Sequence, residues 1–241
     1  MAKIHMILQG KGGVGKSVIA ALLAQYKASK GHQTLCLDTD PINATFHGYH
    51  ALNVQQIALM ENDEIVPRRF DALVEIMAPS AHDIIIDNGA SAFVPLTHYL
   101  ISNQIPALLA RMGHELVIHT VITGGQALLD TVNGFRQLAG QFPAEASFVV
   151  WLNPYWGPIQ HEGKSFEQLK AYQDRKSRVS AIVQIPPLKE ETFGRDLSDM
   201  LQSRLTFDEA LAAASLTIMT RQRLQIIKGK LFDHLDQAAV L

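Results

Sequence analysis

Short apolar runs alternate with longer segments of helical periodicity along this chain. Residues 82–87 (HDIIID) are apolar on both faces, which is typical of a strand buried inside a parallel sheet. In residues 16–30 apolar side chains recur every three or four positions, as in a helix with one buried face, and Gly31 is its expected end. The expected strands are 3–9, 33–38, 82–87, 115–122, 147–153 and 178–184, and the expected helices are 16–30, 67–79, 92–112, 125–141 and 164–176, with further helices to the end.

Strands that alternate with helices in this way predict an α/β fold. The expected architecture is a mostly parallel, twisted sheet with helices on both faces, because each crossover between parallel strands covers one face of the sheet. No internal repeat, low-complexity tract or linker interrupts the alternation. We therefore expect a single domain over residues 1–241.

The composition agrees with a globular protein that buries a sizeable core. Of the 241 residues, 47% are hydrophobic and 18% are charged. The formal net charge of -2 gives no whole-chain support for nucleic-acid binding, which usually needs a basic excess. The single cysteine, Cys36, lies in an apolar run, so we expect a buried side chain and no internal disulfide.

The N-terminal residues show none of the charged-then-apolar pattern of a signal peptide. No apolar stretch approaches the ~20 residues that span a bilayer. We expect a protein of the cytoplasm, or one at the periphery of the inner membrane.

The clearest chemical motif is the segment GKGGVGKS, which matches the phosphate-loop pattern G-x-x-x-x-G-K-[ST] at Gly10, Gly15, Lys16 and Ser17. Glycines let consecutive backbone N–H groups curl around an anion, and the following helix directs its positive end at the phosphates. Lys16 can reach the β- and γ-phosphates, and the Ser17 hydroxyl can bind Mg²⁺. The predicted cofactors are ATP or ADP with Mg²⁺, held by Gly10, Lys11, Gly12, Gly13, Val14, Gly15, Lys16, Ser17 and Val18.

The second lysine of this motif, Lys11, makes the loop resemble the deviant Walker A motif of the ParA and MinD ATPases and the nitrogenase iron protein. In that family the early lysine reaches the nucleotide of a partner subunit. The resemblance implies a P-loop NTPase fold, a homodimer that forms on ATP binding, and a catalytic role for Lys11 in trans beside Lys16. A cation there can neutralise charge on the transferring phosphoryl group.

The segment LDTDP resembles the family's D-x-D-P switch motif. A carboxylate at Asp40 can orient the attacking water or hold a Mg²⁺-bound water, which makes Asp40 a predicted catalytic and metal residue. Asp before Pro also initiates turns without any catalysis. For Asp38, helix-capping, metal and structural roles stay open. The chain departs from the family pattern at Ile42, and the altered spacing puts the rate of hydrolysis in doubt.

The third strand ends in Asp87, the position of the Walker B aspartate, so Ser17, Asp40 and Asp87 are the predicted Mg²⁺ residues. The segment VVWLNP resembles the strand whose terminal asparagine recognises adenine in the family, and this resemblance implies that Asn153 contacts the base. The later segment QIPPL resembles the motif that borders the base through Pro186 and Pro187, although two prolines are also simply a rigid loop.

Residues 215–235 form an expected final helix with Leu216, Met219, Leu224, Ile227, Leu231 and Leu235 on one apolar face and a basic cluster of Arg221, Arg223, Lys228 and Lys230. Three interpretations stay open: a packed helix with a solvated basic face, a membrane-surface helix and a DNA-phosphate contact. The ten histidines show no metal-ligand spacing, and Trp151 and Trp156 are expected to pack rather than stack on a base.

Beyond the motifs, the sequence and its length resemble the TraL family of conjugal-transfer proteins of broad-host-range plasmids. This resemblance implies a protein partner in the plasmid-transfer machinery. The predicted function is a dimerising ATP switch with slow, Mg²⁺-dependent hydrolysis. One alternative is a nucleotide-gated partition or positioning protein with negligible hydrolysis that binds DNA or a membrane. The other is a small-molecule kinase with Arg175 and Arg178 in a lid, against which Lys11 argues.

Overall fold

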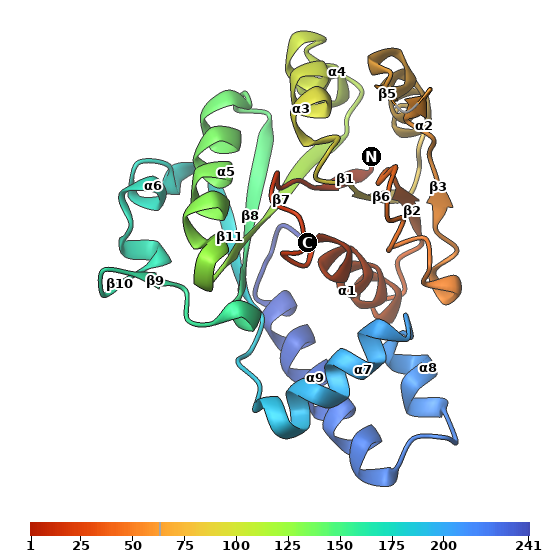
Figure 1. Cartoon of the computed structure of the whole chain (residues 1–241). Helices are drawn as coiled ribbons and strands as arrows, with labels where there is room; N and C mark the ends of the chain where they lie inside the picture. Colours follow the sequence, from red (N-terminus) through yellow and green to blue (C-terminus); the bar gives the residue numbers. More distant parts are fainter. Residues whose placement is uncertain (63) are drawn as a thin grey trace.

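The computed structural model describes residues 1–62 and 64–241. Its centre is a seven-stranded sheet in the order β11-β8-β7-β1-β6-β2-β3, in which every pair of neighbours is parallel (Figure 1). The predicted α/β architecture is therefore confirmed. The strands of this sheet are β1 (Lys3–Ile7), β2 (Thr34–Asp38), β3 (Gln55–Gln56), β6 (Asp83–Asp87), β7 (Glu115–Thr123), β8 (Ala146–Asn153) and β11 (Val179–Gln184), and two short hairpins are formed by β4 (Met60–Glu61) with β5 (Glu64–Ile65) and by β9 (Gln160–His161) with β10 (Lys164–Ser165).

Helices cover both faces of the sheet (Figure 1). One layer contains α2, α3, α4, α5 and α6, and the other contains α1, α7, α8 and α9. Within the described residues, no helix combines the length and the apolar character required to cross a membrane. The helices are α1 (Lys16–Ser29), α2 (Asp71–Met77), α3 (Phe93–Ser102), α4 (Ile105–Arg111), α5 (Leu128–Gln141), α6 (Lys170–Gln173), α7 (Arg195–Gln202), α8 (Phe207–Ala212) and α9 (Ile218–Asp236), with shorter helical turns η1 (His50–Leu52), η2 (Pro67–Phe70), η3 (Gly125–Ala127), η4 (Pro154–Trp156), η5 (Phe166–Gln168), η6 (Lys176–Arg178) and η7 (Glu190–Gly194).

Alternation along the central strands explains why this sheet needs two layers. On β1, Ile4 and Met6 pack in the core under α2–α5, whereas Ile7 packs in the core under α1 and α9. On β6, Ile84 and Ile86 face the first core and Ile85 the second. A strand with apolar residues on both faces cannot leave either face exposed to water, so helices are required on each side.

The expected helix over 164–176 is wrong. The structure has a turn at Glu162 and Gly163, which both adopt positive φ, and this turn joins β9 to β10 in a hairpin. A capping box between Ser165 and Gln168 then starts the separate turn η5, and only Lys170–Gln173 forms an α-helix. Likewise the helical region 92–112 is two helices, because Gln104 adopts a left-handed conformation at φ 51°. Periodicity alone could not reveal these two breaks.

Two buried histidines form a polar chain inside the core under α1 and α9. The Trp151 indole N–H donates to Nδ1 of His119 at 2.9 Å, and Nδ1 of His5 lies 3.0 Å from Nε2 of His119. Since His119 accepts at Nδ1, its proton is on Nε2 and is donated to His5. Burial lowers the pKa of His119 to about 3 and holds the pKa of His5 well below its usual value, so both rings are neutral at pH 7. The two histidines therefore have a structural role inside the core, and Trp151 is buried there as expected.

Candidate nucleotide site

The phosphate loop (residues 10–17) connects β1 to α1 at the carboxyl edge of the sheet (Figure 1). Gly13 and Gly15 adopt left-handed conformations, with φ 72° and 99°, that L side chains rarely take. Among the described residues no side chain caps the start of α1. The N–H groups of its first turn therefore have no side-chain partner, and an anion can bind there.

Lys16 enters this loop from the first turn of α1. Its side chain is buried, and its Nζ donates to the Lys11 carbonyl at 3.1 Å. Burial lowers the pKa of Lys16, while the carboxylates of Asp87 and Asp40 act in the opposite direction. The ammonium thus lies where a phosphate can replace a backbone carbonyl as its partner.

Asp87 ends β6, the strand between β1 and β2. It is 1% exposed, and its Oδ1 has no hydrogen-bond partner among the described residues. Burial raises the pKa of Asp87 to about 7, and the Ser17 hydroxyl and the Lys16 ammonium lower it only in part. A buried carboxylate oxygen without a partner, next to a serine hydroxyl, fits a Mg²⁺ ion, which prefers oxygen ligands.

The post-β2 loop (residues 39–49) faces the phosphate loop from the other side of Asp87. Asp38 is fully buried, and its carboxylate accepts from the backbone N–H groups of Asp40 and His47, both at 2.8 Å. Of the three roles left open for Asp38, the structure favours the structural one: this side chain fixes the course of the loop.

Asp40 is the second residue of this loop and lies close to Gly89. A Cβ added to Gly89 would lie 2.7 Å from the Asp40 carboxylate, so only glycine allows this approach. The Asp40 Oδ1 accepts from the N–H groups of Ile42 at 3.0 Å and Asn43 at 3.2 Å. Asp40 therefore initiates a turn, the non-catalytic role that Asp before Pro allows. Its carboxylate is also close enough to Lys16 to influence the pKa of that ammonium.

Lys11 forms an ion pair with Asp130 on α5, with 2.8 Å between Nζ and Oδ2. The two side chains are 45% and 56% exposed. Exposed ion pairs contribute only about 0–1 kcal/mol, so this pair is easily exchanged for another partner.

The last residue of β8, Asn153, and Trp156 in the turn that follows it hold the middle of the phosphate loop. Nδ2 of Asn153 donates to the Val14 carbonyl at 3.0 Å, and its Oδ1 accepts from the Tyr155 N–H. The Trp156 indole donates to the Gly13 carbonyl at 3.2 Å. Trp156 is 56% exposed and its ring packs edge-on against Tyr155, so it packs only in part. Asn153 braces the loop, and its contact with a base stays a prediction.

The other residues predicted to border the base lie at the same edge of the sheet. Pro186 and Pro187 follow β11, which pairs with β8, and the Ile185 N–H donates to the Leu152 carbonyl next to Asn153. The register of the two strands therefore brings these prolines near the end of β8, as the predicted base pocket requires.

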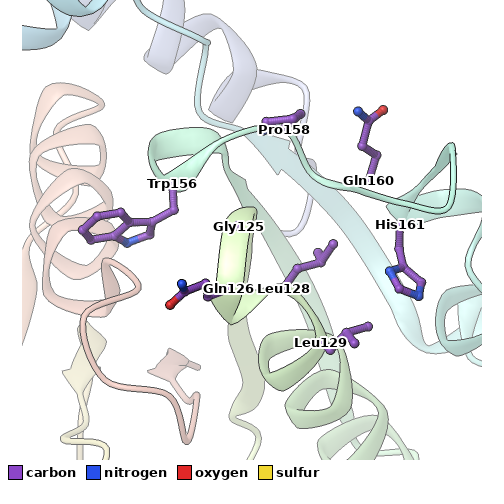
Figure 2. A pocket seen from close by; sticks show the side chains of 8 residues that line it. All are labelled: Gly125, Gln126, Leu128, Leu129, Trp156, Pro158, Gln160 and His161. Atoms are coloured by element: carbon purple, nitrogen blue, oxygen red, sulfur yellow. The ribbon is translucent and has the colours of Figure 1, made fainter.

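An open groove of about 500 Å³ lies beside the phosphate loop. Its lining residues come from η3, the first turn of α5 and the segment after β8, and Figure 2 shows them. In that view the Trp156 side chain points away from Leu128 and Leu129, which line the other part of the groove together with His161.

Arg178 does not lie in the lid that the kinase alternative requires. Its guanidinium donates to the carbonyls of Ala139, Phe142, Pro143 and Ala146, at the end of α5 and the start of β8. This position is the edge of the sheet opposite to the phosphate loop, because α5 runs antiparallel to the strands.

The final helix α9 packs against the sheet through Leu224, Ile227, Leu231 and Leu235, which are all buried. Met219 was expected on this face but is 57% exposed. Two members of the basic cluster pair with acidic residues of the neighbouring helices, Arg223 with Asp196 and Lys228 with Asp208. The structure therefore favours the packed helix among the three interpretations.

Sequence reasoning missed Gln9 and Asp130, two residues that organise the loop. Gln9 is 1% exposed and donates to the carbonyls of Val121 and Thr131. Neither residue belongs to a motif, and their contacts span more than a hundred positions. The pairing of β1 with β7 is what brings Gln9 to Val121 and the phosphate loop to α5.

Comparison with known proteins places this geometry in a family. Residues 5–224 match the model described as the CobQ/CobB/MinD/ParA nucleotide binding domain. Over 241 residues, the chain is 73% identical to an Escherichia coli protein named Protein TraL, with 100% of both chains covered. A second Escherichia coli protein of that name is 72% identical over the same length.

Solved structures share the fold at low sequence identity. A chain of the MinC:MinD cell division protein complex from Aquifex aeolicus has a TM-score of 0.55 and 14% identity, with 96% of each chain covered. The cell division ATPase MinD from Pyrococcus furiosus has a TM-score of 0.52 and 15% identity, with 98% of this chain and 99% of that one covered. These similarities confirm the P-loop fold predicted from the sequence.

Proposed function

This chain belongs to the CobQ/CobB/MinD/ParA nucleotide-binding domain family, and we propose that it is an ATP switch that dimerises and hydrolyses ATP slowly with Mg²⁺. The observation that carries the proposal is the arrangement of Lys16 and Asp87. A buried ammonium and a buried carboxylate oxygen without a partner among the described residues lie at the start of an uncapped helix. A Mg²⁺-nucleotide supplies the opposite charge to each of them.

Each side chain has a distinct role in this proposal. The N–H groups of the phosphate loop and the Lys16 ammonium bind the β- and γ-phosphates. The Ser17 hydroxyl and the Asp87 carboxylate hold Mg²⁺, which when bound neutralises charge on the phosphates. Asp40 orients the attacking water once its turn opens, and Asn153, Pro186 and Pro187 border the base.

Lys11 is the residue that makes the switch dimeric. In the single chain its ammonium is paired with Asp130 at an exposed position. We propose that, with ATP bound, Lys11 leaves Asp130 and reaches the nucleotide of a second copy of the chain. The pair with Asp130 is weak enough to permit this exchange.

One observation favours a nucleotide-gated binding protein without significant hydrolysis. The Asp40 carboxylate accepts two backbone N–H groups of its own turn. If this turn persists with ATP bound, Oδ1 of Asp40 stays occupied and Oδ2, which Asn43 Nδ2 approaches at 3.4 Å, is the acceptor left for a water. Hydrolysis would then be slow, and the dimer would stay longer in the ATP state.

The partner that reads the switch belongs, in our proposal, to the plasmid-transfer machinery, as the resemblance to TraL proteins implies. A DNA or membrane contact through α9 finds less support, because Asp196 and Asp208 pair with two of its four basic residues. Recovery of bound proteins with Asp40→Ala and Lys16→Ala chains, compared in ATP, tests this part.

Titration with a fluorescent ATP analogue and Mg²⁺ tests the nucleotide site. Lys16→Ala should weaken binding by about 10- to 150-fold, the equivalent of about 1.5–3 kcal/mol for a charged hydrogen bond. Lys230→Ala, which removes an exposed lysine of α9, should bind like the wild type. Equal affinity of the Lys16→Ala and wild-type chains would contradict the proposed site.

Light scattering and phosphate release separate the dimer from hydrolysis. With Mg²⁺-ATP the wild type should dimerise, and Lys11→Ala should bind ATP but dimerise with a dissociation constant raised at least about tenfold. Asp40→Ala should dimerise and release phosphate more slowly than the wild type. Equal background rates in the two chains would favour the nucleotide-gated binding protein instead.

A further inference from the structure

Gln9 lies directly before the phosphate loop and is buried between β7 and α5. Its Oε1 accepts from the Gly10 N–H at 2.9 Å. Its Nε2 donates to the Val121 carbonyl at 3.0 Å and to the Thr131 carbonyl at 3.1 Å, and lies 3.4 Å from Thr120 Oγ1. A single carboxamide thus connects the loop, the neighbouring strand and the helix that faces them.

The helix α5 is shaped for this side chain. A Cβ added to Gly134 would lie 2.2 Å from Gln9 Oε1, a separation that atoms do not tolerate. Glycine at 134 therefore lets the carboxamide touch the helix backbone. Glycine inside a helix is usually unfavourable by roughly 0.5–1 kcal/mol relative to alanine, so its presence in α5 is accounted for by this contact.

The hydrogen bonds of Gln9 to Gly10 and Thr131 lie directly beside the ion pair between Lys11 and Asp130. Gly10 donates its N–H to Gln9 and directly precedes Lys11 in the chain. The Thr131 carbonyl accepts from Gln9, and Thr131 directly follows Asp130. Lys11 and Asp130 form the exposed ion pair between the loop and α5. Gln9 therefore fixes the backbone beside both partners, and with it the point from which the Lys11 side chain leaves the loop.

We propose that Gln9 is a positioning residue for Lys11: it holds the start of the phosphate loop at a fixed separation from α5, so that Lys11 is directed to the nucleotide of a second chain. This inference rests on the proposed dimeric switch. Gln9 does not touch the nucleotide in this scheme. Its effect passes through the backbone of Gly10 and Lys11.

The chemistry of the side chain explains why glutamine is needed. Asparagine is one methylene shorter and cannot accept from Gly10 while it donates to Thr131. Glutamate keeps the acceptor and loses the donor to both carbonyls. Methionine has a similar length and makes neither interaction, so it removes the bridge with the smallest change of volume.

The test measures dimerisation and nucleotide affinity separately in Gln9→Met. With Mg²⁺-ATP, its dimer dissociation constant should rise by roughly tenfold or more, the size expected for the loss of hydrogen bonds that hold a charged group in place. The ATP affinity of the monomer, from titration at low protein concentration, should change by less than about threefold. Gln9→Asn should show an intermediate loss and carries the test if Gln9→Met does not fold.

A double-mutant cycle with Lys11 distinguishes positioning from general damage. If Gln9 acts through Lys11, Gln9→Met should have no further effect on dimerisation in a Lys11→Ala chain. Independent losses in the two chains, or an equal loss of ATP affinity and dimerisation, would overturn the proposal. Gly134→Ala should reproduce the phenotype from the helix side.

The outcome also separates this inference from the proposed function. If the wild type does not dimerise in Mg²⁺-ATP, the dimeric switch itself is wrong. If the wild type dimerises and Gln9→Met dimerises equally well, the switch stands and the positioning role is wrong.

Discussion

The phosphate loop and the post-β2 loop face each other across Asp87, but they are held in opposite ways. Residues from distant elements hold the phosphate loop: Asn153 binds the Val14 carbonyl and Trp156 binds the Gly13 carbonyl. The post-β2 loop is tied to β6 at its first residue, where the N–H and hydroxyl of Thr39 both donate to the Asp87 carbonyl. Beyond Thr39 it is held by carboxylates from its own stretch of chain, since Asp38 and Asp40 accept from N–H groups two to nine residues away.

This difference shows which side of the site can move. A loop held by several separate elements keeps its shape unless the sheet itself changes, and so it offers a ready site for phosphates. A loop held by its own carboxylates can rearrange as a unit when those carboxylates meet a new cation. We therefore infer that the phosphate loop binds and the post-β2 loop responds.

Asp38→Ala should have the largest effect and should break the post-β2 loop. The substitution removes the acceptor of the part-buried N–H groups of Asp40 and His47, and each hydrogen bond to a charged group contributes about 1–3 kcal/mol. We expect the free energy of unfolding to fall by about 2–6 kcal/mol in urea titrations.

Asp40→Ala is the matched control, because its carboxylate belongs to the same loop but lies at its exposed part. It should change the free energy of unfolding by less than about 1 kcal/mol. Equal losses in the two variants would show that the loop is not organised around Asp38.

Asp87→Asn should have the next largest effect on the free energy of unfolding. The size of this effect depends on pH, and its sign depends on whether Mg²⁺-ATP is bound. The pKa of Asp87 is raised to about 7 in the folded chain, against 3.8 as its ordinary value. The folded state therefore holds an extra proton between these values, and the nucleotide-free protein loses stability as the pH rises through this window. Asparagine does not titrate, so Asp87→Asn should not lose stability as the pH rises through this window.

We expect Asp87→Asn to be more stable than the wild type by about 2–4 kcal/mol at pH 8 without nucleotide, and by little at pH 4. With Mg²⁺-ATP bound, the wild type should be the more stable of the two chains, because Asp87→Asn lacks the carboxylate that holds Mg²⁺. Thermal unfolding at both pH values, with and without Mg²⁺-ATP, checks this. A wild type that is more stable at pH 8 without ligand would show that Asp87 already has a partner.

Asn153→Ala should have a smaller effect, on the phosphate loop only. It removes the hydrogen bonds to Val14 and Tyr155, which together contribute about 1–3 kcal/mol to stability. We expect weaker ATP binding, measured by titration, and unchanged behaviour of the Asp40 turn. Asn153→Asp keeps the acceptor for Tyr155 and separates the two bonds. Unchanged ATP affinity in both variants would argue that the brace is dispensable.

The sequence was sufficient to predict most of the fold and the central chemistry of the site. The motif from Gly10 to Ser17 is local, so the phosphate loop could be recognised from its own residues even though distant elements brace it. The strand ending in Asp87 was predictable for the same reason, since apolar runs followed by a carboxylate are visible within six residues.

What the sequence did not reveal depends on contacts between distant segments. Gln9 meets Thr131 and Lys11 meets Asp130 only because β1 pairs with β7 and α5 follows β7. The hairpin in place of the helix over 164–176 depends on a turn at Gly163, and the helical spacing around it gave no sign of this turn.

Trp156→Phe should have the smallest effect on stability and gives the most direct view of the phosphate loop. The indole makes one hydrogen bond to Gly13 from a half-exposed position, so its loss should cost less than about 1 kcal/mol. The other tryptophan, Trp151, is fully buried and bonded to His119, so it should not sense the nucleotide. Mg²⁺-ATP should therefore change the tryptophan emission of the wild type but not that of Trp156→Phe, and Tyr155→Phe should keep the response. Because the phosphate loop is already formed, the change should follow the binding isotherm in a single rapid phase. A slow second phase, or a response that survives in Trp156→Phe, would mean that binding rearranges this side of the site as well, and the contrast between the two loops would then be lost.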